Sequence, residues 1–278
     1  MADAQISLHL RMDRETFLLY ESVPVTLTIR NSSGRPIQLG GEANPQWLRF
    51  VIYDKDGIQV PPIGARAMES VSLPPAQSVS RTFDLLPFYE LRQRGSYRVQ
   101  ALVEDGTVRV VSAPVAFHIV HGREIWSQTV GLPGETNAPP EYRTYSLVTR
   151  RDARYETLYV GVKNMANGVV YGMLPLGMYI ETGDLETLLD KDANLHVLYR
   201  NGPRSFGYVQ IRPDAKVADQ SAYTEWMSKP HLASSAEGIV SVQGGEKGGT
   251  APPLVLPEAP APPPKPEKKK HWWWPFGK

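Results

Sequence analysis

One alternating stretch near the start of the chain constrains the fold more than any other feature. Within residues 17–34, apolar side chains recur at every second position from Val23 to Ile29. A period of two is typical of a β-strand that has one face on a hydrophobic core. Asn-Ser-Ser-Gly at 31–34 then predicts a turn, because these residue types tolerate tight backbone bends. The alternation predicts that Val25, Leu27 and Ile29 point inward and that Thr26, Thr28 and Arg30 face out.

The remainder of the first 120 residues repeats this pattern in about seven or eight short segments. Turn-forming residues separate the segments at roughly the 8–12-residue spacing that is typical of a β-sandwich. No segment with helical periodicity competes with them. The alternating segments lie at 6–10, 37–39, 47–53, 79–85, 95–103, 108–111 and 115–119.

Three motifs in this region resemble bacterial immunoglobulin-like domains. They are Tyr-Glu-Ser-Val-Pro-Val at 20–25, Tyr-Asp-Lys-Asp-Gly at 53–57 and Gly-Ser-Tyr-Arg-Val at 95–99. Similar domains occur as modules of macroglobulin-type proteins and in the intracellular proteinase-inhibitor family of bacilli. The resemblance implies an immunoglobulin-like β-sandwich at residues 5–120, a scaffold that hosts many different functions.

A second β domain is expected at residues 121–230. After strands at 123–130 and 143–149, residues 158–164 line up with residues 195–201, an offset of about 37 residues. Each copy predicts a hairpin with an Asn- and Gly-containing turn. Two copies are too few for a propeller, so we expect a small sandwich or barrel built from a duplicated hairpin. This segment resembles repeat-containing domains of uncharacterised secreted bacterial proteins.

The C-terminal region, residues 231–278, is expected to be a disordered linker that ends in a docking segment. Residues 244–249 are Gly-rich and residues 259–266 are Pro-rich, compositions that favour a flexible and an extended chain respectively. The candidate binding residues are Lys268, Lys269, Lys270, Trp272, Trp273, Trp274 and Phe276. Tryptophan beside lysine suits a membrane interface or a protein groove, and a merely adhesive terminus remains the alternative.

Composition excludes several classes of protein. A chain of 278 residues with 41% hydrophobic content suits two packed domains, and a net charge of +1 argues against a nucleic-acid-binding domain. The absence of cysteine excludes disulfides, cysteine-ligated zinc and thiol catalysis. No apolar run is long enough for a transmembrane helix. The first residues lack the basic and apolar regions of a signal peptide, although a mature chain restarted at an added Met would look the same.

Residues with catalytic or metal-binding chemistry do not form a recognisable motif. The six histidines show no metal-ligand spacing, and neither a Gly-x-Ser-x-Gly elbow nor a phosphate loop is present. Asp54 and Asp56 beside Gly57 predict a hairpin turn rather than a calcium loop. Glu21 is expected to accept backbone hydrogen bonds, and Trp47 and Trp126 are expected in packing rather than in carbohydrate binding. We therefore expect no enzyme activity, cofactor or metal.

These observations favour a non-catalytic interaction or assembly protein of the bacterial envelope, periplasm or exterior. The expected partner is a protein or a membrane surface that binds the C-terminal segment, with no role for nucleic acid. The alternative is a proteinase inhibitor that inserts the loop at 61–70 into a protease. A glycan hydrolase would need paired carboxylates in a cleft, and the sequence shows candidate carboxylates throughout the chain but no recognisable constellation of them. A cytoplasmic location stays open.

Overall fold

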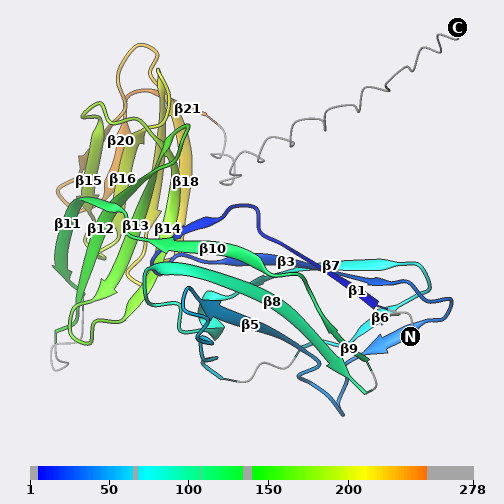
Figure 1. Ribbon diagram of the computed structural model, residues 1–278. Helices are drawn as coiled ribbons and strands as arrows, with labels where there is room; N and C mark the ends of the chain where they lie inside the picture. The colour runs from blue at the N-terminus through cyan, green and yellow to red at the C-terminus, as the bar shows by residue number, and fades with distance from the viewer. Residues whose placement is uncertain (1–5, 65–67, 107, 134–139, 249–278) are drawn as a thin grey trace, which may run out of the picture.

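The computed structural model describes residues 6–64, 68–106, 108–133 and 140–248 (Figure 1). Strands account for the regular structure of these residues, apart from one short 3-10 turn, η1 (Leu86–Phe88). The expected all-β fold is therefore confirmed. Among the described residues, no helix is long and apolar enough to cross a membrane.

Two sheets enclose the core of the first domain (Figure 1). One sheet has the strand order β1-β3-β7 and the other has the order β2-β10-β8-β5, with β9 paired to β8. A short third pair joins β4 to β6. The strands are β1 (Ile6–Arg11), β2 (Thr16–Leu18), β3 (Pro24–Asn31), β4 (Ile37–Leu39), β5 (Leu48–Asp54), β6 (Val71–Leu73), β7 (Ser78–Asp84), β8 (Gly95–Asp105), β9 (Val108–Val111) and β10 (Val115–Val120).

Strand β3 is the alternating run, and its side chains point as the pattern predicts. Val25, Leu27 and Ile29 are buried, whereas Arg30 is exposed. The hydroxyls of Thr26 and Thr28 form hydrogen bonds on the outer face with the hydroxyls of Thr82 (2.9 Å) and Ser80 (2.7 Å) of β7. The predicted orientation is confirmed because one face of the strand meets the facing sheet and the other meets solvent.

The second domain is also a sandwich of two sheets, with strand orders β11-β12-β13-β14 and β15-β16-β17-β18-β21, in which β21 is the short strand Glu246–Lys247. Its core takes buried side chains from both sheets. The duplicated hairpins are β13–β14 and β16–β17, one in each sheet, and the turns begin at Asn164 and Asn201. The strands are β11 (Arg123–Gly131), β12 (Tyr142–Arg151), β13 (Glu156–Asn164), β14 (Val170–Tyr179), β15 (Leu185–Leu189), β16 (Leu195–Arg200), β17 (Ser205–Ile211) and β18 (Val217–Thr224).

The expectation that residues 231–248 are a disordered linker is wrong. They form the hairpin β19 (His231–Ser234) and β20 (Val240–Gln243), and β21 (Glu246–Lys247) pairs with β18. Leu232 and Val240 are buried against the outer side of β16 and β17. These strands are only two to four residues long, too short for alternation to identify them, and the apolar surface that they cover comes from elsewhere in the chain. Residues 249–278 lie outside the described residues.

The two domains meet at an elbow between β10 and β11, which only residues 121 and 122 separate. Leu18 of the first domain packs there with Val148 and Tyr159 of the second. The backbone N–H of Met173 in β14 also donates to the carbonyl of Tyr20 at 3.2 Å. The elbow is therefore a packed interface rather than a bare linker.

A buried ion pair reinforces this elbow. Glu21 is 1% exposed, and its carboxylate accepts from Arg14 Nη2 at 2.5 Å and from the Leu18 N–H at 2.7 Å. The expected role of Glu21 as a backbone acceptor is confirmed, and Arg14 is an additional partner. Burial raises the pKa of Glu21 above the ordinary carboxyl value, although Arg14 opposes that shift.

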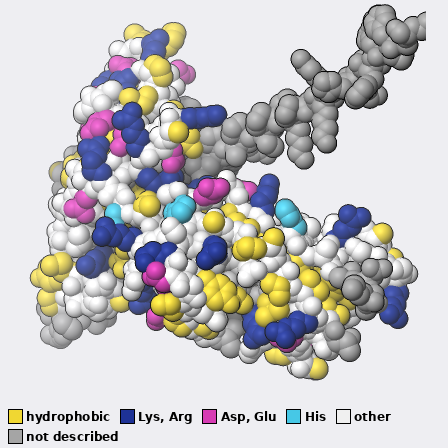
Figure 2. All heavy atoms as spheres, viewed as in Figure 1, with side chains coloured by type: hydrophobic (Ala, Val, Ile, Leu, Met, Phe, Trp, Pro, Cys, Tyr) yellow, Lys and Arg dark blue, Asp and Glu magenta, His cyan; other side chains and the backbone are white. Residues whose placement is uncertain are grey.

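Hydrophobic side chains gather on the visible face of the first domain, over the sheet that contains β8 and β5, and Lys or Arg side chains border them (Figure 2). A surface of this kind is informative, because a soluble domain usually hides its larger apolar patches unless they bind something.

Candidate functional site

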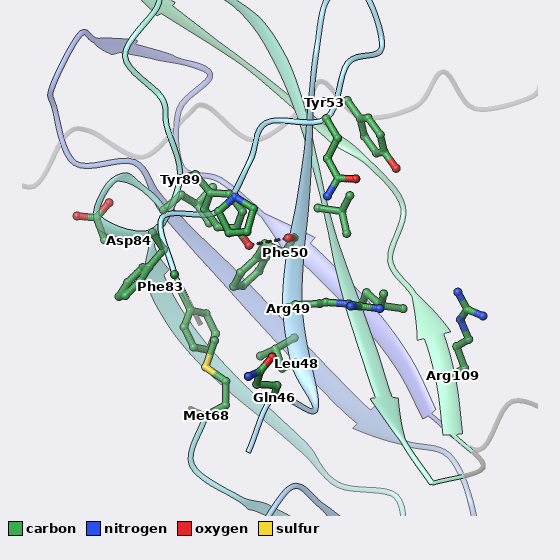
Figure 3. Close-up of a pocket in the computed structure, with 17 residues that line it drawn as sticks. Gln46, Leu48, Arg49, Phe50, Tyr53, Met68, Phe83, Asp84, Tyr89 and Arg109 are labelled. Atoms are coloured by element: carbon green, nitrogen blue, oxygen red, sulfur yellow. Dashed lines mark hydrogen bonds between the residues drawn. The ribbon is translucent and has the colours of Figure 1, made fainter. Parts of the chain in front are cut away.

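The candidate site is a cleft on the open side of the first sandwich (Figure 3). The two sheets end there in the edge strands β5 and β7, and a contact between Phe50 of β5 and Phe83 of β7 joins them. The cleft has a volume of about 600 Å³, within the range of ligand-binding pockets in proteins. It is named the open-edge cleft below.

Apolar side chains form most of the lining of the open-edge cleft. The Phe50 ring of β5 and the Phe83 ring of β7 lie 5.2 Å apart, edge to face, and so link the two edge strands. Aromatic rings provide large contact areas at binding sites. The other apolar side chains of the lining are Leu48, Val51, Pro62, Met68, Leu85, Phe88 and Leu102.

Two polar groups in the cleft wall are committed to the fold. The Tyr89 hydroxyl donates to the Phe50 carbonyl at 2.6 Å, and burial raises the pKa of Tyr89, which keeps it a neutral donor. The Asp84 carboxylate accepts from the backbone N–H groups of Val23 (2.9 Å) and Leu86 (3.1 Å). These hydrogen bonds fix the positions of the residues that form the cleft wall.

The rim of the open-edge cleft is basic. Arg49 of β5 contacts Glu104 at 2.8 Å, and Arg109 of β9 lies 3.9 Å from the same carboxylate. One carboxylate facing two guanidinium groups leaves a local positive charge. The rim is therefore suited to a ligand that carries a negative group.

The edge of β5 that faces away from β8 has backbone hydrogen-bond partners along only half of its length. Residues 58–60 fold back on its C-terminal half, where Asp54 N–H donates to the Ile58 carbonyl and Val60 N–H donates to the Ile52 carbonyl, both at 2.9 Å. In an antiparallel pair, alternate residues direct their backbone groups to the same side. Leu48 and Phe50 therefore direct theirs toward this edge, where no described backbone group pairs with them.

A second group of polar side chains lies inside the second domain. His196 is 3% exposed, and its two ring nitrogens contact the Tyr208 hydroxyl (2.8 Å) and Asp190 Oδ2 (3.1 Å). Burial raises the pKa of Tyr208 to about 12, which makes its phenolate scarce near neutral pH. Because Asp190 also accepts from Asn194 at the β15–β16 turn, this group holds that turn together.

The candidate docking residues predicted from the sequence, Lys268, Lys269, Lys270, Trp272, Trp273, Trp274 and Phe276, lie outside the described residues. The proposed inhibitor loop at 61–70 is described except for residues 65–67. In it, Ile63 is 48% exposed, and its N–H donates to the Phe88 carbonyl at 2.8 Å.

Other sequence-based interpretations are resolved by the geometry. Asp54 Oδ1 accepts from the N–H groups of Asp56 (2.9 Å) and Ile58 (2.8 Å), so it stabilises the hairpin turn as expected. Trp47 is buried in the first core, and Trp126 packs against the second. Within the part of the chain that the structure describes, no three His, Asp or Glu side chains form a group able to hold a metal ion.

Sequence reasoning missed the open-edge cleft. Phe50 and Phe83 occupy apolar positions of two predicted strands, and nothing local indicates that both strands end their sheets. A scan against models of known protein families found no match, and a search of curated proteins found none either.

Proposed function

We propose that this protein is a non-catalytic interaction protein of the bacterial envelope or exterior. The body binds a partner protein through the open-edge cleft, and the Lys- and Trp-rich C-terminal segment attaches the body to a second surface, either protein or lipid. The immunoglobulin-like character of the first sandwich, which its motifs suggest, belongs to this proposal and is consistent with a binding role.

The open-edge cleft is the observation that carries the proposal. A cleft of about 600 Å³ with an apolar lining and a basic rim offers contact area and charge selection. Its polar wall groups, Tyr89 and Asp84, are already engaged with the backbone. This chemistry favours recognition over bond breaking.

A site-directed cross-link tests the partner-binding part. A photoreactive amino acid replaces the exposed Gln59 at the cleft, and a control chain carries it in place of the exposed Arg30 on β3. Irradiation with envelope extract is expected to give a discrete protein adduct from position 59 and none from position 30. Equal labelling at both positions, or none at position 59, contradicts the proposal.

The C-terminal segment is tested separately from the body, as an isolated peptide of residues 259–278, on anionic vesicles and on envelope extract. The peptide in which Trp272, Trp273 and Trp274 are replaced by Ala is expected to lose binding, because desolvated aromatic side chains usually dominate such contacts. Salt is expected to weaken binding modestly by screening the neighbouring lysines. If the original peptide binds neither surface, or the replaced peptide binds as well as the original does, the segment has no docking role.

A second candidate function is proteinase inhibition, and Ile63 favours it. The Ile63 side chain is 48% exposed, and the Ile63 N–H donates to the Phe88 carbonyl. On the other side of residues 65–67, the Met68 N–H donates to the Pro45 carbonyl at 2.7 Å. An exposed side chain on an anchored loop suits the specificity pocket of a protease. Inhibition assays against a panel of serine proteases test this candidate. If the protein is an inhibitor, Ile63→Asp is expected to weaken the inhibition. If the wild-type chain inhibits no protease of the panel, this candidate is wrong.

A further inference from the structure

We propose that an extended peptide of a partner protein adds as a strand to the free half of β5, with apolar side chains in the open-edge cleft and a carboxylate beside Arg49. This inference rests on the proposed function, because it names the occupant of the same cleft. Three features of the described residues support it: the direction of the β5 backbone groups, the alternation of side chains along β5, and the charge of the rim.

The backbone direction comes first. Leu48 and Phe50 direct their N–H and C=O groups to the free edge, as Ile52 and Asp54 do toward residues 58–60. The Phe50 carbonyl accepts from Tyr89, while the two N–H groups and the Leu48 carbonyl have no described backbone partner. An exposed strand edge of this kind is a template for another strand.

The side-chain alternation of β5 then determines what such a strand carries. Leu48 and Phe50 are buried on the inner face, and Arg49 is exposed on the outer face. In a pleated sheet, side chains at neighbouring positions of adjacent strands lie on the same face. An added strand therefore places every second side chain next to Phe50 and Phe83 and the intervening ones next to Arg49.

The rim charge selects the intervening side chain. Arg49 and Arg109 share a single carboxylate, Glu104, and the Asp84 carboxylate is engaged with two backbone N–H groups. Cross-strand pairs of opposite charge stabilise a sheet, whereas like charges directly opposite each other destabilise it. A glutamate or aspartate beside Arg49 is thus favoured over a lysine.

The other occupants fit these observations less well. The C-terminal segment of this chain carries five lysines against one glutamate from residue 259 onward, which opposes a basic rim. A second copy of β5 would bring Arg49 of one chain near Arg49 of the other if the two strands paired about a twofold axis centred on that residue. Both remain outcomes of the experiment below.

The probe is a capped, labelled heptapeptide, Thr-Val-Glu-Val-Thr-Val-Thr, and binding to the full chain is followed by fluorescence anisotropy. A matched peptide carries Lys in place of Glu. The wild-type chain is expected to prefer the Glu peptide by about fivefold, the ratio that about 1 kcal/mol of charge pairing gives. Arg49→Glu is expected to reverse the preference, and the control Arg30→Glu, on the other sheet, is expected to keep it.

Two N-methylated probes test the backbone pairing. One carries the methyl groups on the valine amides and the other on the intervening amides. Only one set of amides faces β5 in an added strand, so one probe is expected to lose binding and the other to retain it. If both bind alike, the peptide is held by side chains alone and strand addition is wrong.

Other results would also overturn the inference. One is no binding of either parent peptide at concentrations up to about 1 mM. Another is a dimer that Arg49→Glu dissociates, which assigns the cleft to a second copy. A third is a chain that binds the peptide only after Trp272, Trp273 and Trp274 are replaced by Ala, which would mean that this chain's own C-terminal segment occupies the cleft. If the cross-link from position 59 persists in any of these cases, the proposed function survives and only the mode of binding fails.

Discussion

Arg14 of the first domain and Tyr159 of the second domain meet across the elbow, where Arg14 Nη1 donates to the Tyr159 hydroxyl oxygen at 3.4 Å. Arg150 Nε donates to the same oxygen at 3.3 Å, and Arg14 also pairs with the buried Glu21. Burial raises the pKa of Tyr159, so its hydroxyl stays neutral at ordinary pH. A tyrosine from one domain and a carboxylate from the other thus share the same guanidinium group.

Replacing Glu21 with Gln is expected to destabilise the protein by about 1–3 kcal/mol, because the amide has one acceptor oxygen where the carboxylate accepts from both Arg14 and the Leu18 N–H, so one donor is left without a partner. Urea unfolding measures the loss. The matched control is Glu124→Gln, whose exposed side chain on β11 has little to lose. Equal, small losses in both variants would mean that the ion pair does not stabilise the elbow.

Gly122→Ala is expected to disturb the elbow through crowding alone. A Cβ at this position would lie 2.2 Å from Val148 Cγ1 and 2.8 Å from the Thr149 carbonyl oxygen. Overpacking of this kind typically costs about 1–3 kcal/mol. Gly34→Ala serves as the control, since its Cβ would meet nothing within 4 Å. Thermal melts that shift equally in the two variants would contradict the packed elbow.

In the first core, Leu27→Ala is expected to lower the free energy of unfolding by about 2–5 kcal/mol, because Leu27 is 1% exposed between the two sheets. Thr28→Ala removes a hydroxyl on the outer face, and a much smaller loss is expected there. Chemical denaturation of the two variants compares them directly. The half-buried strand would be disproved by similar losses at the two positions.

Two truncated variants, one ending after residue 235 and one after residue 248, test whether residues 231–248 stabilise the fold. Ending the chain after residue 235 removes β20 and β21, exposes the surface that Val240 covers, and is expected to lower the melting temperature by at least about 4 °C. Ending it after residue 248 keeps every described strand, so no change is expected. Calorimetry that shows no difference between the two would make the last hairpin dispensable.

Asp184 is expected to contribute to stability in a pH-dependent way. Hydrogen bonding to Lys229, aided by Arg200 and Thr182, lowers its pKa to about 2 from an ordinary value of 3.8. Because the folded-state pKa is the lower one, the contribution is complete above about pH 5 and is lost as the pH falls toward 2.

The test of this contribution is a comparison of Asp184→Asn with the wild type by unfolding at several pH values. The stability difference between the two chains is expected to be largest near neutral pH and to shrink between about pH 5 and pH 2. A difference that does not change with pH would show that the carboxylate charge contributes nothing.

Some parts of the structure follow from local sequence, and β3 is the clearest. Its inward and outward faces are predictable because a strand repeats every two residues, so Val25 and Thr26 must lie on opposite faces. The Asp54 turn is equally local, since the carboxylate bonds to N–H groups two and four residues later. The strand β20 escaped prediction because the surface that stabilises Val240 is provided by residues such as Phe206 of β17.

The sequence by itself determined that this chain is all-β, where most strands run and which of their faces are buried, because those properties depend on neighbours a few residues away. Only the tertiary structure decided that β5 and β7 end their sheets, that Phe50 meets Phe83 beside a cleft, and that Arg14 reaches Tyr159 across the elbow. The physical reason is that sheet pairing joins segments far apart in the chain, as in the pairing of Leu48 with Val103. No local pattern records which strand is left without a neighbour.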